Sequence, residues 1–162
     1  MKRIFPLLAA LFLASAQAQN TTPATFTLDG RTLGQTTVYV SGGQLMLPLT
    51  AFAQLGWKPL LDTDNSLIDL AGCLRVSTVR PNMWLIGGLS HSGVSSASAL
   101  APLPVNAQFR GGRWYLPARA VAGQLLYTVT FDKANARVDV KKPADPAKIN
   151  PTVEACLLGL SR

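Results

Sequence analysis

Histidine is nearly absent from this 162-residue chain, which contains His91 alone. A serine-hydrolase site needs a general base beside its nucleophile, and the Ser90-His91-Ser92 triplet does not form such a set. The sequence has no Gly-x-Ser-x-Gly motif, no phosphate-binding loop and no dinucleotide fingerprint. We therefore expect a protein that binds rather than one that catalyses a reaction.

Acidic residues are also few, with eight Asp and Glu against fifteen Lys and Arg. Most of the aspartates fall in expected turns or strand ends, where a carboxylate accepts hydrogen bonds from backbone N–H groups. We expect no glycosidase-type carboxylate pair among them. The segment 62–65 has the start of a calcium loop but lacks the glycine and the glutamate that complete one. These aspartates are Asp62, Asp64, Asp69, Asp132 and Asp139.

Long hydrophobic runs are absent after the N-terminus. Lys2 and Arg3 precede an uncharged apolar run over 4–15, and Ala16-Gln17-Ala18 follows it, which is the pattern of a cleavable signal peptide over 1–18. The run is shorter than the roughly 20 residues that span a bilayer, although an uncleaved anchor stays an alternative. We expect an exported protein of the periplasm, cell envelope or extracellular space, with no transmembrane span after cleavage.

The positive charge is spread along the chain. Without Lys2 and Arg3, thirteen basic and eight acidic residues remain, and Lys141-Lys142 is the only adjacent basic pair. Nucleic-acid sites concentrate such residues on one face, so we expect no nucleic-acid partner. The charge indicates either an ordinary solvated surface or attraction to anionic envelope polymers.

Cys73 and Cys156 are the only cysteines. In an exported protein, a distant pair is expected to form a disulfide, which would attach the C-terminal segment to the middle of the chain. Two free buried thiols, or two thiolates that bind copper, are the alternatives.

An internal repeat organises the chain. Residues 41–53 align with 110–122, and the two blocks share a Gly-Gly pair and a Leu-Pro pair. After a slip of one residue, 62–70 aligns with 132–140. We expect repeats at about 36–70 and 105–140, separated by a linker over 71–104.

Each repeat is predicted to contain a hairpin, a helix and a second hairpin. Gly-Gly tolerates the positive φ of a tight turn, and Pro48 and Pro117 suit the first turn of a helix. We expect helices over 49–55 and 118–126, the second a turn longer because Leu125 stands opposite Gly56. The predicted fold class is α+β, with two β-hairpin–helix–β-hairpin repeats around short antiparallel sheets and a C-terminal helix docked on them.

This order of elements resembles the copper amine oxidase N-terminal-like domain, the stalk-type domain of some copper amine oxidases. Leu47-Pro48 and Leu116-Pro117-Ala118-Arg119 carry the resemblance, which covers about 25–142 within a domain at 19–142. The resemblance implies an exported bacterial protein and transfers no copper ligand or catalytic residue, because the stalk carries neither. The long linker and the lack of an attached catalytic module depart from the family pattern.

The linker and the tail are predicted to be partly ordered. Residues 73–79 and 82–86 are expected to be strands, and the small, polar stretch 87–98 a mobile loop that is either functional or only disordered. After an extended tail, an amphipathic helix is expected over 152–160, within the C-terminal region 143–162.

For function, we expect a non-catalytic binding or accessory protein of the envelope that docks on a protein partner or a wall polymer. Tyr and Trp are favoured at recognition surfaces, and we add the arginine of the second Leu-Pro block. No cofactor is expected. The candidate binding residues are Trp57, Trp84, Trp114, Tyr115 and Arg119.

Two alternatives stay open. Met83, His91 and Met46 are donors suited to copper, and a copper ion among them would give an antioxidant, superoxide dismutase-like redox activity, the one enzymatic possibility. The second alternative is a purely structural subunit of a membrane-associated envelope complex without a ligand of its own.

Overall fold

The computed structural model describes residues 21–86, 97–144 and 156. Strands dominate these residues, two short helices accompany them, and the strands form two open sheets, so the fold is mixed α+β as predicted. In this part of the chain, no helix has the length and apolar character needed to cross a membrane. The predicted signal peptide and, apart from Cys156, the predicted C-terminal helix lie outside the described residues.

The larger sheet has seven strands in the order β11-β12-β1-β2-β3-β10-β9. The predicted sheets were antiparallel, but β1 and β12 are parallel neighbours, with Thr25 opposite Arg137. The reason is that β1, which the repeat pattern does not include, inserts between β12 and β2. The strands are β1 (Thr22–Leu28), β2 (Arg31–Ser41), β3 (Gln44–Pro48), β9 (Gln108–Arg110), β10 (Arg113–Pro117), β11 (Thr128–Asp132) and β12 (Arg137–Lys141).

The smaller sheet is an antiparallel meander of five strands in chain order. Alternate residues of its middle strands are buried, as the two-residue period of a strand requires. This face packs toward the rest of the molecule and includes Ile68, Leu74 and Met83. The strands are β4 (Leu60–Asp62), β5 (Leu67–Leu70), β6 (Leu74–Ser77), β7 (Asn82–Ile86) and β8 (Ala97–Pro102).

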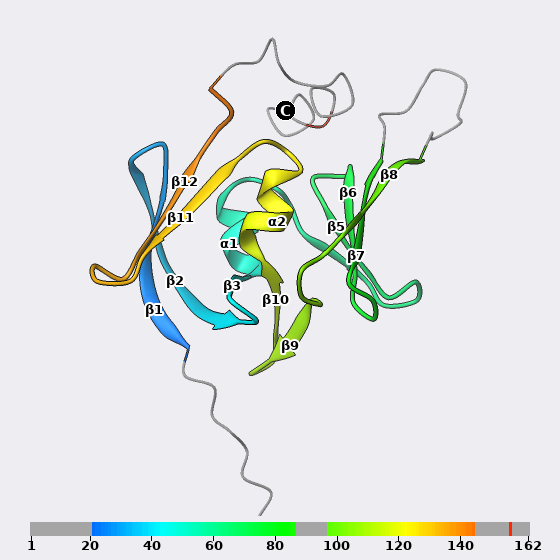
Figure 1. Ribbon diagram of the computed structural model, residues 1–162, viewed down its shortest axis with the longest axis horizontal. Helices are drawn as coiled ribbons and strands as arrows, with labels where there is room; N and C mark the ends of the chain where they lie inside the picture. The colour runs from blue at the N-terminus through cyan, green and yellow to red at the C-terminus, as the bar shows by residue number, and fades with distance from the viewer. Residues whose placement is uncertain (1–20, 87–96, 145–155, 157–162) are drawn as a thin grey trace, which may run out of the picture.

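The helices α1 (Leu49–Gln54) and α2 (Ala118–Gly123) lie between the two sheets (Figure 1). Both contribute buried residues to one hydrophobic cluster that also draws on both sheets. The buried alanines let the helices pack closely against the strands, so a single core holds the two sheets together. Its residues without exposed surface include Phe26, Trp57, Ile68, Leu70, Leu74, Val76, Leu116, Val121 and Leu125.

Two tight hairpins occupy the large sheet. Gly42 and Gly43 connect β2 to β3 with φ of 54° and 74°, and Gly111 and Gly112 connect β9 to β10 with φ of 52° and 76°. Two consecutive positive φ values define the type I′ turn, whose twist matches that of the strands.

The two helices begin in the same way and have the same length. Pro48 and Pro117 are the residues before the first helical turns, and each helix has six residues. The expectation that the second helix is a turn longer is wrong. Each helix is followed by a residue with positive φ, Gly56 after α1 (φ 84°) and Leu126 after α2 (φ 62°). The extra residue of the second segment lies between the end of α2 and Leu126.

The hairpins β4–β5 and β11–β12 have the same kind of turn. Asp62 accepts hydrogen bonds from the backbone N–H (3.0 Å) and side-chain amide (2.8 Å) of Asn65. Asp132 accepts the same two bonds from Asn135, at 3.1 and 2.7 Å. Asparagine and aspartate thus close both turns by their side chains, which is the structural role expected for these aspartates.

The linker forms three strands rather than two. The strand predicted over 82–86 is β7, whereas the one predicted over 73–79 is the shorter β6. The predicted loop 87–98 ends early, because Ala97 and Ser98 already belong to β8. Residues 87–96 of that loop, with His91, lie outside the described residues.

Candidate functional site

The structure separates the predicted binding residues. Trp57 has no exposed surface, and its ring centroid lies 5.6 Å from that of Phe52 and 5.2 Å from that of Tyr127. Tyr115 is also buried, whereas Trp84 on β7 and Trp114 on β10 are half-buried and lie on different sheets. Trp57 and Tyr115 therefore contribute to packing, and the aromatics do not form one platform.

Arg119 has a structural contact of its own. Its exposed side chain donates a hydrogen bond from Nε to the carbonyl oxygen of Val129, at 3.2 Å. Val129 lies on β11, which is one edge of the large sheet. Since an unpaired carbonyl on an edge strand can accept a partner strand, Arg119 protects this edge.

The predicted copper donors are not brought together. Met46 belongs to a small cluster with Tyr39 and Tyr115, whereas Met83 lies in the main core, and neither has more than 1% of its surface exposed. His91 lies outside the described residues. Within 21–86, 97–144 and 156, no three His, Cys, Asp or Glu side chains gather as metal ligands do.

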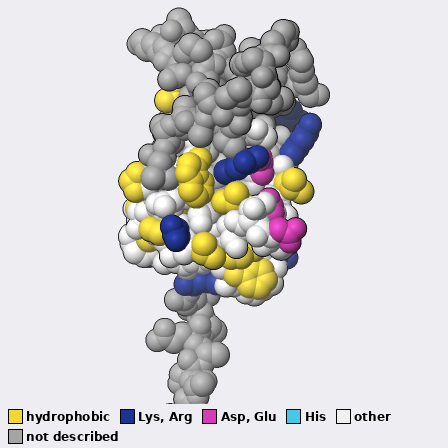
Figure 2. All heavy atoms as spheres, turned by 90° about the vertical axis from the view of Figure 1, so that its right-hand side faces the viewer, with side chains coloured by type: hydrophobic (Ala, Val, Ile, Leu, Met, Phe, Trp, Pro, Cys, Tyr) yellow, Lys and Arg dark blue, Asp and Glu magenta, His cyan; other side chains and the backbone are white. Residues whose placement is uncertain are grey.

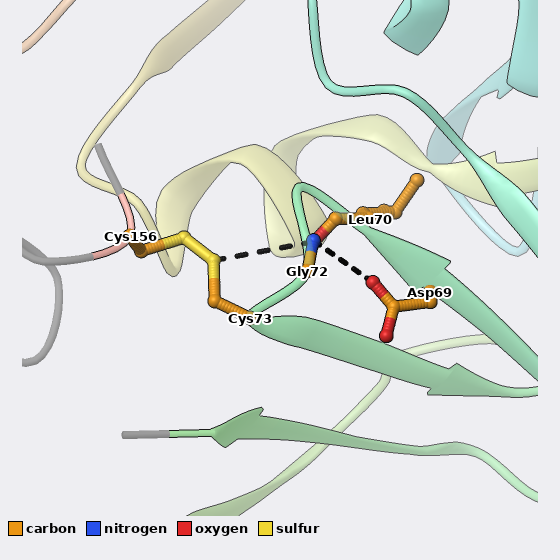
Figure 3. Close-up of a disulfide and its surroundings, with 5 residues drawn as sticks. All are labelled: Asp69, Leu70, Gly72, Cys73 and Cys156. Atoms are coloured by element: carbon orange, nitrogen blue, oxygen red, sulfur yellow. Dashed lines mark hydrogen bonds between the residues drawn. A yellow bond between two sulfur atoms is a disulfide. The ribbon is translucent and has the colours of Figure 1, made fainter. Parts of the chain in front are cut away.

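Cys73 and Cys156 form a disulfide with their Cα atoms 5.7 Å apart, within the separation of about 7 Å that such a bond allows. Figure 3 shows the bond beside the turn between β5 and β6, where Gly72 donates its N–H to Asp69 Oδ1 at 2.9 Å. Both cysteines are buried. The disulfide thus fastens Cys156 to the small sheet.

One face of the large sheet carries a second, smaller cluster of buried side chains. Tyr39, Met46 and Tyr115 form it, and the Tyr39 and Tyr115 rings meet edge to face at 5.0 Å. Burial raises the pKa of Tyr39, and the nearby charge of Arg110 lowers it in part. Because these residues come from β2, β3 and β10, the cluster packs three neighbouring strands together at this end of the sheet.

On the same face, side-chain contacts run from β2 to the edge strand β9. The Tyr39 hydroxyl donates to Gln108 Oε1 at 2.9 Å, and the Gln108 amide donates to Ser41 Oγ at 3.0 Å. Arg110 stacks over the Tyr39 ring, with its Cζ 4.3 Å from the ring centroid. The side chains on this face of β9 are therefore held in place by the sheet.

The backbone of β9 is an unprotected edge. Arg110 and Arg113 flank the two-residue turn, so their backbone groups are hydrogen-bonded to each other. Hydrogen-bonded and non-hydrogen-bonded pairs alternate along an antiparallel ladder, so Phe109, one residue before Arg110, directs its N–H and C=O away from β10. Among the described residues, Phe109 has no other backbone partner. Its side chain is 60% exposed and its ring lies 5.3 Å from that of Trp114. An exposed aromatic side chain therefore coincides with two backbone groups that have no partner in the part of the chain that the structure describes.

The small sheet also has an edge strand with exposed hydrophobic residues, Leu60 and Leu61 on β4, but none of its described residues is an exposed aromatic. Figure 2 shows hydrophobic side chains on the side of the molecule where this sheet lies as separate groups between polar ones. Leu60 and Val79 are the most exposed of the hydrophobic residues in this sheet and its turns, and singly exposed residues of this kind are ordinary on a protein surface. We therefore take the β9 edge as the candidate site.

Sequence reasoning identified Trp114 and missed Phe109, Arg110, Gln108 and Tyr39. A three-residue strand is too short for alternation to show which side chain is exposed. One pattern could have found the arginines, because a two-residue Gly-Gly turn places the residues that flank it directly opposite each other.

Comparisons of the chain with protein-family models, with curated proteins and with solved structures find no match. The resemblance to the copper amine oxidase stalk domain therefore rests on the sequence blocks alone.

Proposed function

We propose that this chain is an exported, non-catalytic binding protein of the cell envelope that docks on a protein partner through β9. The free edge of β9 carries the proposal, because Phe109 combines an exposed ring with outward-facing N–H and C=O groups. An extended segment of a partner can extend a sheet at such an edge, with backbone hydrogen bonds for affinity and side-chain contacts for specificity.

A protein partner fits this face better than a wall polymer does. Sugar rings stack on exposed aromatic surfaces, and here Trp57 and Tyr115 are buried. Phe109 and Trp114 are tilted by 54° to each other and do not make a flat platform. Free backbone groups of an edge strand, by contrast, are matched by another strand.

Export is supported by two observations. The N-terminal 18 residues have the three parts of a signal peptide. The disulfide between Cys73 and Cys156 is of the kind that persists in oxidising compartments outside the cytoplasm.

We further propose that 36–70 and 105–140 are two copies of one hairpin–helix–hairpin unit of the stalk-domain type. Their type I′ Gly-Gly turns, their helix starts at Pro48 and Pro117, and their Asp–Asn turns agree in position and backbone conformation. Trp57 and Tyr127 both donate their N–H at 3.1 Å to the carbonyl five residues earlier. These local agreements support a common origin for the two units.

The docking proposal can be tested by photo-crosslinking in the producing cells. A benzophenone amino acid is placed at the exposed Asn106, two residues before β9, or at the exposed Val79, between β6 and β7, as a control. Each is combined with Phe109→Pro, which removes the outward N–H while the inward bonds of β9 remain. We expect a protein adduct from position 106 that Phe109→Pro reduces at least severalfold, and none from position 79.

Adducts of equal yield from both positions, or an adduct at 106 that Phe109→Pro leaves unchanged, would overturn docking at β9. The melting temperature of the Phe109→Pro variant, measured on the purified mature chain, separates loss of docking from loss of the fold.

A further inference from the structure

Two arginines face each other across the β9–β10 hairpin. Arg110 and Arg113 are directly paired, so their side chains leave the same face of the sheet. The ion pairs found within the described ranges involve other arginines, and neither of these two has a carboxylate partner there. Like charges opposite each other destabilise a strand pair. The hairpin therefore holds two positive charges that an external anion would neutralise.

Arg110 is oriented before any ligand arrives. Its guanidinium lies over the Tyr39 ring, and Tyr39 is itself fixed by its bond to Gln108. The Nη1 atom of Arg110 is buried and has no hydrogen-bond partner among the residues that the structure describes. A guanidinium whose plane is fixed in advance loses little freedom when it forms the paired hydrogen bonds that a carboxylate accepts.

The pairing geometry determines which side chains of a bound segment meet these groups. In a strand added to β9, the residue opposite Phe109 lies on the same face as Phe109 and Trp114. The residues on either side of it lie on the opposite face, where Arg110 and Arg113 are. The surface therefore fits a segment in which an acidic residue adjoins an apolar one.

We propose that the occupant of β9 is an extended, acidic segment of a protein partner, with its carboxylate bound by Arg110 and Arg113. This inference rests on the proposed docking at β9 and names the chemistry of the partner. A second copy of this chain is a poor occupant, because its own β9–β10 hairpin would add two further arginines to the same face.

Peptide titrations test the inference. The mature, disulfide-bonded chain is titrated with the peptide Thr-Val-Asp-Val-Asp-Val-Thr and with the same peptide carrying Asn in place of both Asp, and amide NMR shifts are followed. We expect the acidic peptide to bind about tenfold more tightly at low salt and to shift the amides of β9, because bonds between charged groups are the stronger ones. Arg110→Gln or Arg113→Gln should remove this difference, whereas Arg80→Gln, between β6 and β7 and not paired with either arginine, should keep it.

The outcomes separate the two proposals. If both peptides bind with equal affinity and Phe109→Pro abolishes both, docking at β9 stands and the acidic preference is wrong. If the acidic peptide binds only where Arg110 is present but Phe109→Pro has no effect, strand addition is wrong. Absence of any binding by the acidic peptide overturns the acidic preference. As a further readout, Arg113→Gln should not lower the melting temperature, since it removes a repulsion rather than a contact.

Discussion

The segments 36–70 and 105–140 have the same local elements but place their second hairpins in different sheets. β2–β3 and β9–β10 both lie in the large sheet, on either side of the β3–β10 contact. The hairpin β4–β5 then joins the small sheet, whereas β11–β12 returns to the far edge of the large one. Local turn chemistry is thus the same in both segments while the partner strands differ.

The neighbours account for this difference. β5 pairs with β6, which follows it after a short turn, and β12 pairs with β1, which lies more than a hundred residues earlier in the chain. A strand pairs with a free edge at which its apolar face becomes buried. For β5 this edge belongs to β6, the strand that follows it directly in the chain. The comparison teaches that two segments with the same local turns can be placed differently by the strands beside them.

The largest effect on stability should come from substitutions of Leu47 and Leu116, which precede Pro48 and Pro117. Leu47 and Leu116 are 1% and 0% exposed on neighbouring strands, where an introduced carboxylate has no partner. We expect Leu47→Asp and Leu116→Asp each to abolish cooperative thermal unfolding. Leu60→Asp is the control, because Leu60 is 67% exposed, and it should melt within a few degrees of the wild type. If only one leucine variant unfolds, the two segments do not share the core equally.

The disulfide should affect the two segments differently, because Cys73 lies in the turn between β5, the last strand of the first segment, and β6. We expect Cys73→Ser to lower the free energy of unfolding by about 2–5 kcal/mol, the usual range for loss of a native disulfide. Amide hydrogen exchange should accelerate in β5 and β6 and stay unchanged in β11 and β12. Cys73→Ser combined with Cys156→Ser is the control for the free thiol that the single change leaves. Uniform acceleration across both sheets would contradict a local role.

A smaller effect of opposite sign is expected at the last residue of the Asp–Asn turns. Ser66 and Ala136 have φ of 55° and 46°, a conformation that strains residues other than glycine. Ser66→Gly and Ala136→Gly should each raise the free energy of unfolding by about 0.5–1 kcal/mol. Ala134→Gly, in the same turn but outside the positive-φ region, should lower it. Chemical denaturation measures all three, and opposite responses at 66 and 136 would show that the turns differ.

The smallest effect concerns the aspartates of the same turns. Hydrogen bonds from Asn65 and Asn135 hold the pKa of Asp62 and Asp132 below the ordinary 3.8. Because the folded-state pKa is lowered, each carboxylate stabilises the fold fully above 3.8 and loses this contribution as the pH falls through the folded value. Asp62→Ala and Asp132→Ala should therefore lower the melting temperature slightly and equally at pH 7, and less at pH 2. Asp64→Ala, whose carboxylate makes no hydrogen bond among the described residues, is the matched control.

Local features were accessible from the sequence because short-range chemistry decides them. Gly42-Gly43 and Asp62 act within a few residues of themselves and have the roles that their residue types predict, and Pro48 lies one residue before the helical turn for which it was predicted. The choice of sheet, by contrast, depends on β1, which lies before the first predicted repeat and pairs with β12 and β2. β8 was missed because its alanines and serine have little preference for strands, and pairing with β7 holds it there.

The candidate site was less accessible for a related reason. A tryptophan or tyrosine suits a core as well as a surface, so composition could not separate buried Trp57 from half-buried Trp114. The position of Phe109 at a sheet edge follows from the order of the strands, which the sequence alone does not show. Arg119, which matched the stalk-domain block, instead donates to the opposite edge.

The parallel pair of β1 and β12 has a consequence for how fast this protein folds. Asp139 on β12 accepts hydrogen bonds from Thr27 on β1, 112 residues away, and from Arg137 beside it at 2.7 Å. The large sheet cannot close until these two distant strands meet, and contacts of such long sequence separation slow folding far more than they affect stability. β2, β3 and the two Gly-Gly hairpins can form early from nearby residues, whereas the β11–β12 ribbon must wait for its place beside β1. Until then, the edges of both β1 and β12 are exposed to other chains, and the interval before they pair is when the newly made protein is most open to aggregation.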